Sequence, residues 1–89
     1  MKIVWTRRAL TDLARITDRI AQDKPLVAQA FVEDLREKVA RLQTFPLLGR
    51  ASPYDDAREL VVHRNYLVTY RIRADEVQVL QVWHVARQR

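Results

Sequence analysis

Four basic side chains in the second half of the sequence are the strongest candidates for chemistry. They are Arg58, Arg71, His84 and Arg87. An arginine guanidinium stays charged and can hold a carboxylate or a phosphate through two parallel hydrogen bonds. A histidine titrates near neutral pH, so it can also donate or accept a proton. The four residues therefore predict a surface for an acidic or phosphate-bearing partner.

Several other kinds of site are excluded by the residues that the sequence lacks. There is no cysteine, which excludes a disulfide, a Cys-ligated zinc site and a thiol nucleophile. Gly49 is the only glycine, so the glycine-rich loops that hold nucleotide phosphates cannot form. The only serine, Ser52, has no nucleophile-elbow motif around it. With only two histidines, we expect no metal site and no cofactor.

The length of 89 residues allows one domain over residues 1–89. Sixteen Lys and Arg against eleven Asp and Glu give a net charge of +5. This charge favours nucleic acid or an acidic protein as the partner. No apolar run approaches the roughly 18 residues that would cross a membrane, and no signal-peptide pattern opens the sequence. We expect a cytoplasmic protein with no membrane partner.

The elements that must position these side chains begin with a short strand over residues 2–5. Thr6 is a suitable N-cap for a helix over residues 7–22, and Pro25 suits the first turn of a second helix over residues 25–43. Apolar residues recur in both segments at helical spacing: Ala9, Leu13, Ile16 and Ile20, then Ala28, Val32, Leu35, Val39 and Leu42. The short break between the segments predicts an antiparallel helical hairpin.

Three segments with a two-residue period follow, rich in β-branched and aromatic residues. They predict strands over Arg58–His63, Tyr66–Ile72 and Val77–Val85, joined by two-residue turns at 64–65 and 74–75. The resulting order β-α-α-β-β-β predicts an α+β fold, in which the helical hairpin packs on a mainly antiparallel sheet.

Uninterrupted two-residue hairpins would fix the register of these strands. One face would then carry Arg58, Leu60, Val62, Leu67, Thr69, Arg71, Gln78, Leu80, Val82 and His84. The other face is predicted to meet the helices, in a core that includes Leu13, Ile16, Leu35, Val39, Val68 and Trp83. Three leucines of the first face are predicted to stay exposed and to contact a protein partner: Leu60, Leu67 and Leu80. The loop over residues 45–53 is predicted to bury Phe45, Leu47 and Leu48.

Several short segments carry a resemblance to a known superfamily. They are Trp5-Thr6 with Ala9, Asp12-Leu13 and Ile16, then Phe45–Arg50, Arg58–Val62, Asn65–Val68, Tyr70–Ile72, and His84 with Arg87. On these segments, which span almost the whole chain, the sequence resembles the RelE/ParE superfamily of type II toxin–antitoxin toxins, and most closely its ParE-like branch. The resemblance implies the RelE/ParE-like fold. It also implies a toxin, of the kind that serves plasmid stabilisation, neutralised by an acidic antitoxin that folds onto it.

The superfamily holds two activities on one fold. RelE-like members cleave mRNA on the ribosome, and ParE-like members inhibit DNA gyrase. A nuclease must deprotonate a 2′-hydroxyl, stabilise the phosphate charge and protonate the leaving oxygen. Arg58 and Arg87 match basic positions of the nucleases, but Leu60 and Leu67 stand where further charge stabilisers are found. The resemblance therefore implies a non-catalytic, ParE-like toxin that binds gyrase through the four basic residues.

Two alternatives stay open at this point. One is a ribosome-dependent mRNA endonuclease that uses the same four basic residues, with His84 as general acid or base. The other is a basic nucleic-acid-binding module without toxicity. Single residues also keep structural alternatives, because Arg58 can form a structural salt link and Tyr70 can pack in the core.

Overall fold

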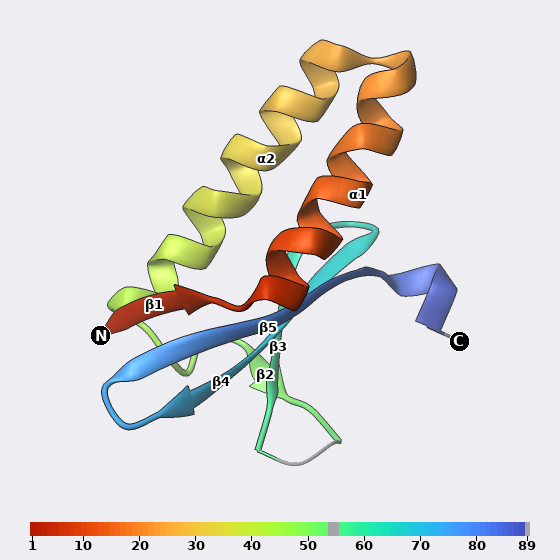
Figure 1. Ribbon diagram of the computed structural model, residues 1–89. Helices are drawn as coiled ribbons and strands as arrows, with labels where there is room; N and C mark the ends of the chain where they lie inside the picture. Colours follow the sequence, from red (N-terminus) through yellow and green to blue (C-terminus); the bar gives the residue numbers. More distant parts are fainter. Residues whose placement is uncertain (54–55, 89) are drawn as a thin grey trace.

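The computed structural model describes residues 1–53 and 56–88, with side chains described as far as residue 86. Two helices lie side by side on one face of a five-stranded sheet (Figure 1). The elements in chain order are β1 (Lys2–Trp5), α1 (Arg7–Asp23), α2 (Pro25–Ala40), the 3₁₀ helix η1 (Arg41–Gln43), β2 (Arg50–Ala51), β3 (Arg58–His63), β4 (Tyr66–Arg73), β5 (Glu76–His84) and the 3₁₀ helix η2 (Val85–Gln88). This confirms the predicted α+β fold and adds the short strand β2, which the sequence pattern did not reveal.

The helical hairpin forms where the sequence places its caps. The Thr6 hydroxyl accepts a hydrogen bond from the Ala9 amide at 3.2 Å, so it caps α1. Lys24 separates the two helices, and Pro25 occupies the first turn of α2, where its missing N–H costs nothing. The last predicted turn of α2 is the 3₁₀ helix η1. Neither of the two described helices is long and apolar enough to cross a membrane.

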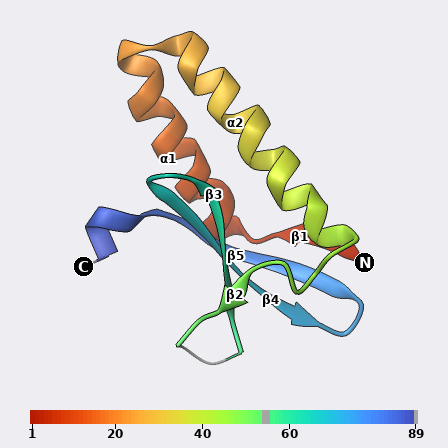
Figure 2. The same cartoon turned by 180° about the vertical axis from the view of Figure 1, so that it is seen from behind.

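The sheet has the strand order β1-β5-β4-β3-β2. β1 pairs with β5 in parallel, and the other three pairs are antiparallel, which confirms the prediction of a mainly antiparallel sheet. The view from behind brings β2 and β3 in front of β5 (Figure 2). β1 and β2 are therefore the two edge strands of the sheet.

Two β-bulges change the register that plain hairpins would give. The β3–β4 pairing shifts between Val61 and His63, and the β4–β5 pairing shifts between Thr69 and Tyr70, opposite Leu80. Each bulge adds one residue to one strand, so the side chains beyond it change faces. We call the helix-facing side of the sheet the inner face and the opposite side the outer face.

Because of these bulges, the predicted division of residues between the two faces is wrong for part of β3 and part of β5, whereas the faces predicted for β4 are confirmed. Leu60, Val62 and Val82 belong to the inner face and share the core with Val68 and Tyr70. His84 also lies on the inner face, because its cross-strand partner Tyr66 does. Arg58 lies there for the same reason, since it pairs with Tyr70. Hairpin spacing alone could not show these exchanges, because the turns themselves have the expected two residues.

The core lies between the helical hairpin and the inner face, and it contains most of the predicted residues. The confirmed members are Leu13, Leu35, Val39 and Val68, which are buried, and Ile16, which is half-buried and packs against them. The prediction for Trp83 is wrong, because the β5 bulge turns this residue to the outer face opposite Leu67. Trp83 is half-buried there, and its indole N–H donates to the Thr69 hydroxyl at 2.8 Å.

The exposure predicted for the three partner-contacting leucines is wrong for two of them. Leu60 and Leu67 are only 8% and 3% exposed, whereas Leu80 is half-buried at the β5 bulge. The β3 bulge turns Leu60 into the core. Leu67 stays on the outer face, between its cross-strand partners Val61 and Trp83.

Replacing Leu35 with Ala should lower the free energy of unfolding by about 2–5 kcal/mol. Leu35 is 1% exposed, so the change removes buried apolar contacts and leaves a cavity. Chemical denaturation followed by circular dichroism measures the effect. The matched control is Leu26→Ala at the start of α2, where the leucine is 80% exposed and the expected change is below about 0.5 kcal/mol. Equal losses from the two variants would contradict the packing of α2 described here.

Candidate functional site

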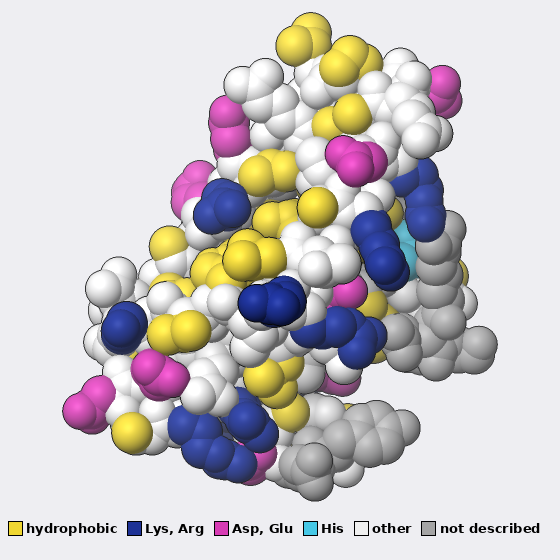
Figure 3. Space-filling model, in the orientation of Figure 1, with side chains coloured by type: hydrophobic (Ala, Val, Ile, Leu, Met, Phe, Trp, Pro, Cys, Tyr) yellow, Lys and Arg dark blue, Asp and Glu magenta, His cyan; other side chains and the backbone are white. Residues whose placement is uncertain are grey.

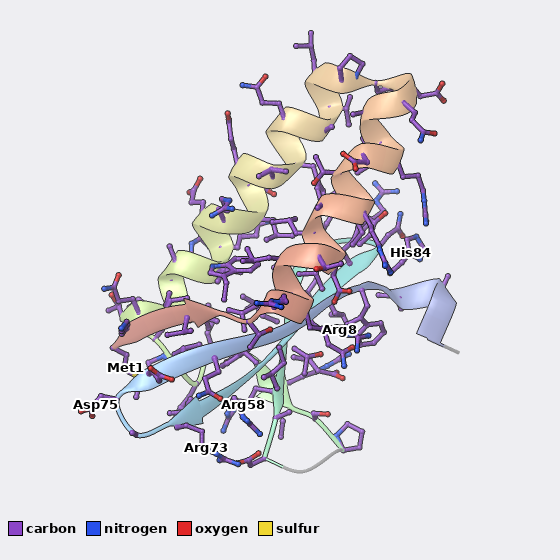
Figure 4. All side chains as sticks on the ribbon, in the orientation of Figure 1. Met1, Arg8, Arg58, Arg73, Asp75 and His84 are labelled. Carbon is purple, nitrogen blue, oxygen red and sulfur yellow. The ribbon has the colours of Figure 1, made fainter. Side chains whose placement is uncertain are left out.

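The structure does not bring the four predicted basic residues together. Arg71 lies five residues beyond Tyr66 on β4, and Tyr66 pairs with His84. At about 3.3 Å per residue, Arg71 is roughly 16 Å from His84 along the sheet. Figure 4 shows Arg58 and His84 at opposite ends of the strands. The prediction of one shared surface is wrong because β4 and β5 run antiparallel; the side chain of Arg87 lies outside the described residues.

Arg58 holds a loop in place at its end of the sheet. It pairs with Tyr70 across β3 and β4, and its guanidinium donates to the Gly49 carbonyl at 2.8 Å. The side chain is half-buried. This geometry matches the structural alternative for Arg58, with a backbone carbonyl in place of a carboxylate as its partner.

Tyr70 is the centre of the same arrangement. The side chain is fully buried, and its hydroxyl donates to the Pro46 carbonyl at 2.7 Å. The same oxygen accepts a hydrogen bond from the Gly49 amide at 2.9 Å. We call these residues, Pro46, Gly49, Arg58 and Tyr70, the Tyr70 anchor. Sequence reasoning placed Tyr70 in the core but missed the two hydrogen bonds of its hydroxyl.

Gly49 is required in the anchor for space. A Cβ atom at this position would lie 2.7 Å from the Tyr70 ring and 2.8 Å from the Glu59 carbonyl oxygen. The close approach explains why the single glycine of the sequence stands here. That isolated glycine was the available sequence signal for the anchor, since glycine allows a backbone to come close to other groups.

Burial raises the pKa of the Tyr70 phenol above its ordinary value. The hydrogen bond from Gly49 and the charge of Arg58 act in the opposite direction but do not cancel the effect of burial. Tyr70 is therefore neutral at physiological pH, and its hydroxyl can both donate and accept in the anchor.

The loop held by the anchor turns its apolar side chains outward. Phe45, Leu47 and Leu48 are 61%, 65% and 51% exposed, so the prediction that they are buried is wrong. The anchor uses the backbone of this loop, at Pro46 and Gly49, and leaves the neighbouring side chains to solvent.

A groove opens between this loop and β3. It has a volume of about 370 Å³ and is lined by Lys38, Arg41, Leu48, Gly49, Arg50, Glu59, Leu60 and Val61. We call it the Leu48 groove. Its volume is near the lower end of ligand-binding pockets, and its walls combine apolar side chains with three cations and one carboxylate. Such a lining suits a short protein segment better than a buried small molecule.

Arg71 lies on the outer face, away from Arg58, and has partners of its own. Its Nε donates to the Gln78 side chain at 2.9 Å, as the predicted clustering of these two residues requires. Nearby, Arg73 forms an ion pair with Asp56. The hydrogen bond from Arg73, and then the charges of Arg73 and Arg71, lower the pKa of Asp56 below its ordinary value. Part of the charge of Arg71 is thus balanced locally.

The opposite end of the sheet carries an aromatic cluster. The Tyr66 ring makes edge-to-face contacts with Phe31 at 5.0 Å, with His84 at 4.9 Å and with His63 at 5.9 Å between ring centroids. Nδ1 of His84 accepts a hydrogen bond from the Ala86 amide at 3.1 Å. Nδ1 of His63 accepts one from the next turn, at 3.4 Å. We call this region the His84 end.

Exposed cations of α1 continue along this side of the molecule. The Asp12 carboxylate accepts a hydrogen bond from the Val82 amide at 3.1 Å, which ties the first half of α1 to β5. The next turns of α1 carry Arg15 and Arg19, which are exposed and have no ion pair within the described residues. In Figure 3, Lys and Arg side chains gather on this side beside a histidine.

The two regions differ in what they can do. The Leu48 groove offers apolar contacts edged by cations. The His84 end offers aromatic rings beside Arg15 and Arg19, which form no ion pair among the described residues. Within the described residues, no cluster of His, Asp or Glu could hold a metal ion. Both regions have the chemistry of protein-binding surfaces.

Comparison with known proteins relates this fold to bacterial toxins. Residues 3–89 match the family model described as the ParE toxin of the type II toxin–antitoxin system parDE. Toxin RelE2 of Caulobacter vibrioides is 37% identical over 86 residues, which are 97% of each chain. The putative toxin Y4kP of Sinorhizobium fredii is 36% identical over 88 residues, covering 98% of this chain and 91% of the other.

A solved structure extends the likeness to three dimensions. The chromosomal ParDE system from P. aeruginosa matches with a TM-score of 0.86 and 31% sequence identity, over 96% of both chains. The packing of two helices on a mixed five-stranded sheet is thus shared with a toxin–antitoxin system of known structure.

Tyr70→Phe should lower the free energy of unfolding by about 1–3 kcal/mol, because it leaves the buried Gly49 amide without its acceptor. Thermal and urea denaturation measure the loss. Tyr66→Phe is the matched control, since no hydrogen bond of the Tyr66 hydroxyl is present among the described contacts. The anchor would be contradicted if both variants lost the same small amount.

The difference in free energy of unfolding between wild type and Tyr70→Phe should also depend on pH. The pKa of Tyr70 is raised in the folded state, so the folded protein keeps this proton while the unfolded chain begins to lose it near pH 10. The stability from Tyr70 is then complete below about pH 10 and is lost as the pH rises through the folded-state pKa. Urea titrations between about pH 8 and 11 should show that the stability difference between the two proteins becomes smaller as the pH rises.

Proposed function

Because this chain belongs to the ParE toxin family of type II toxin–antitoxin systems, we propose that it arrests growth by binding DNA gyrase. In this proposal it cleaves no nucleic acid itself. One observation carries it: the basic residues that a nuclease would use together lie apart or have other partners. Arg58 holds the Gly49 carbonyl and Arg71 holds Gln78, while His84 lies at the other end of the sheet.

The bonding of His84 supports the same proposal. Because Nδ1 accepts a hydrogen bond from the Ala86 amide, the neutral ring carries its own proton on Nε2. In that tautomer Nε2 cannot take a proton from a substrate, and protonation of Nδ1 would break the bond to Ala86. Leu60 and Leu67 are buried apolar residues, so neither can stabilise the charge of a reacting phosphate.

We place the gyrase-binding surface at the His84 end. The exposed Arg15 and Arg19 can pair with carboxylates of the target there, and the aromatic cluster supplies adjacent apolar area. Arg87 remains part of this proposal through its sequence position, three residues after His84. Arg58 and Arg71 then support the shape of the domain instead of touching gyrase.

Neutralisation by an acidic antitoxin is the second component of the proposal. The structural relative from P. aeruginosa is described as a ParDE toxin–antitoxin system. The net charge of +5 would steer an acidic protein toward this chain. A cytoplasmic setting, where gyrase acts, and a role in plasmid stabilisation follow from the same proposal.

Cleavage of mRNA on the ribosome is the alternative that needs an experiment. Its support is the name of a close relative, RelE2, which is 37% identical over 97% of this chain. The purified protein should block gyrase supercoiling and leave mRNA intact on programmed ribosomes. Induced expression should likewise cause filamentation and DNA damage signalling before translation stops. Ribosome-dependent mRNA cleavage, with supercoiling unaffected, would overturn the gyrase proposal.

Arg19→Glu should weaken gyrase inhibition roughly three- to tenfold at low ionic strength, because it reverses a cation on the proposed target surface. Lys24→Glu is the matched control, an equal charge change at the hairpin turn, and should change inhibition by less than about twofold. Supercoiling assays over a range of salt concentrations measure both. Equal effects of the two variants would point to net charge alone.

His84→Gln should keep gyrase inhibition within a few-fold of wild type, because glutamine retains a hydrogen-bonding side chain. In a nuclease that used His84 as acid or base, the same change would cost about 10²–10⁴ in rate. The two purified-protein assays separate these outcomes.

A further inference from the structure

We propose that His84 is a positioning residue. Its neutral imidazole holds the C-terminal 3₁₀ helix η2 against the end of the sheet, and protonation of the ring releases η2 and weakens binding of the target. The use of η2 in binding gyrase rests on the proposed function. The bonding of η2 and its dependence on pH rest on the contacts at the end of β5.

Two hydrogen bonds fix the start of η2. The Val85 amide donates to the carbonyl of Asn65, in the turn between β3 and β4, at 2.9 Å. The Ala86 amide donates to Nδ1 of His84 at 3.1 Å. We call these contacts the two η2 bonds. A backbone carbonyl accepts at any pH, whereas a histidine ring titrates near neutral pH. Of the two η2 bonds, only the one to His84 can therefore respond to pH in the physiological range.

Little buried apolar surface helps to hold η2 in place. Val85 is half-buried and Ala86 is exposed. In Figures 1 and 2, η2 projects beyond the end of β5, and neither α1 nor α2 covers it. A segment with few buried contacts opens at a low cost in free energy. The loss of one of the two η2 bonds is then enough to change the fraction of time for which η2 is held.

The bond between Ala86 and His84 follows the pattern of an Asx turn, in which a side-chain acceptor binds the amide two residues later. His63 uses the same pattern with the Asn65 amide, at 3.4 Å. A neutral imidazole accepts at Nδ1 when its proton is on Nε2. A protonated imidazole carries a proton on both nitrogens and accepts at neither. Protonation of His84 therefore places a donor opposite the donor of Ala86.

Aromatic neighbours hold the His84 ring in the orientation that this bond requires. The Tyr66 ring of β4 packs edge-to-face against it, at 4.9 Å between ring centroids. His63 of β3 and Phe31 of α2 make edge-to-face contacts with the same Tyr66 ring. Among these neighbours, the Tyr66 phenol and the His63 imidazole are titratable and Phe31 is uncharged. The packed rings keep Nδ1 of His84 directed at η2 instead of turning with the solvent.

The charged groups on this side give a protonated His84 no partner in exchange. α1 contributes Arg15 and Arg19, and the turn between β3 and β4 contributes Arg64, which are all exposed cations. The Asp12 carboxylate of α1 already accepts a β5 amide at 3.1 Å. Among the described residues, His84 forms no ion pair with a carboxylate. Protonation of His84 therefore breaks one of the two η2 bonds and forms no ion pair to replace it.

The state of η2 changes what the His84 end presents to a target. Arg87, which the proposed function includes in the target surface, is the third residue of η2. When η2 is held, the backbone at this position has one place relative to the sheet. A binding segment that is already ordered loses less conformational entropy when it binds. The neutral form of His84 therefore favours tighter binding than the protonated form.

Nuclear magnetic resonance of the full chain tests the bond directly. Between about pH 8 and 5, the Ala86 amide signal of wild type should titrate together with the His84 ring. His84→Asn keeps an acceptor for the amide two residues later but does not titrate, so its Ala86 amide should not change over this range. His63→Asn is the matched control. It removes the other histidine of the aromatic cluster and should leave the titration of Ala86 in place.

Direct binding to gyrase tests the consequence for the target. Between about pH 7.5 and 5.5, the affinity of wild type should fall roughly three- to tenfold relative to that of His84→Asn, as expected for one lost hydrogen bond. This ratio cancels any effect of pH on gyrase itself. His63→Asn should show the same fall as wild type. His84→Phe keeps a ring beside Tyr66 but has no acceptor, so its affinity should be reduced at both pH values.

Four results would contradict parts of this scheme. An Ala86 amide that does not respond to pH, or that titrates equally in His84→Asn, would refute the bond to His84 as the cause. Loss of the titration in His63→Asn would assign it to His63. Release of η2 with an unchanged affinity for gyrase would show that target binding does not use η2. Absence of gyrase binding by wild type at both pH values would refute the proposed function alone, because the amide titration does not depend on gyrase.

Discussion

A tyrosine hydroxyl buried in a protein core has to find hydrogen-bond partners, and the solution found for Tyr70 determines much of this structure. No strand or helix supplies those partners; the loop between η1 and β2 does, through the Pro46 carbonyl and the Gly49 amide. The loop must approach the sheet closely, which requires glycine at position 49. Its backbone therefore faces the core and its leucines face solvent. One polar atom in the core thus produces the exposed apolar surface of the Leu48 groove.

Much of the fold could be predicted from the sequence because local signals agreed. Helical spacing, the Thr6 cap and Pro25 at the start of α2 specified the hairpin within a turn. The period of two specified the three long strands. The bulges could not be predicted, because Val62 and Leu80 fit an ordinary strand pattern and the extra residue appears only when two strands are paired. The bulge in β3 reversed the face of Leu60, and the bulge in β5 reversed the faces of Val82 and Trp83.

The candidate site was harder to predict than the fold, for two physical reasons. Residue type suggested that Arg58, Arg71 and His84 act together, but antiparallel strands place the end of β5 beside the start of β4, far from Arg71. The burial expected for Phe45 and Leu48 followed from their hydrophobicity alone. It failed because the loop backbone, with its polar groups, had the stronger demand for the buried partner that Tyr70 offers. Neither the separation of the basic residues nor the bonds between the loop and Tyr70 can be predicted from a single sequence until the pairing of its strands is known.

The arrangement also separates two kinds of arginine. Arg58 and Arg71 lie on sheet strands away from the His84 end and have fixed hydrogen-bond partners, whereas Arg15 and Arg19 lie on a helix surface without ion pairs in the described chain. A guanidinium already bonded to the protein gives up those bonds before it can bind a new partner, so the free arginines can bind an acidic partner at lower cost. The Leu48 groove and the His84 end belong to different ends of β3, since Glu59 and Leu60 line the groove and His63 belongs to the aromatic cluster. A domain this small can therefore present two surfaces of different chemistry at the two ends of one strand. The groove is apolar and edged by cations, and the His84 end is basic and lies beside aromatic rings.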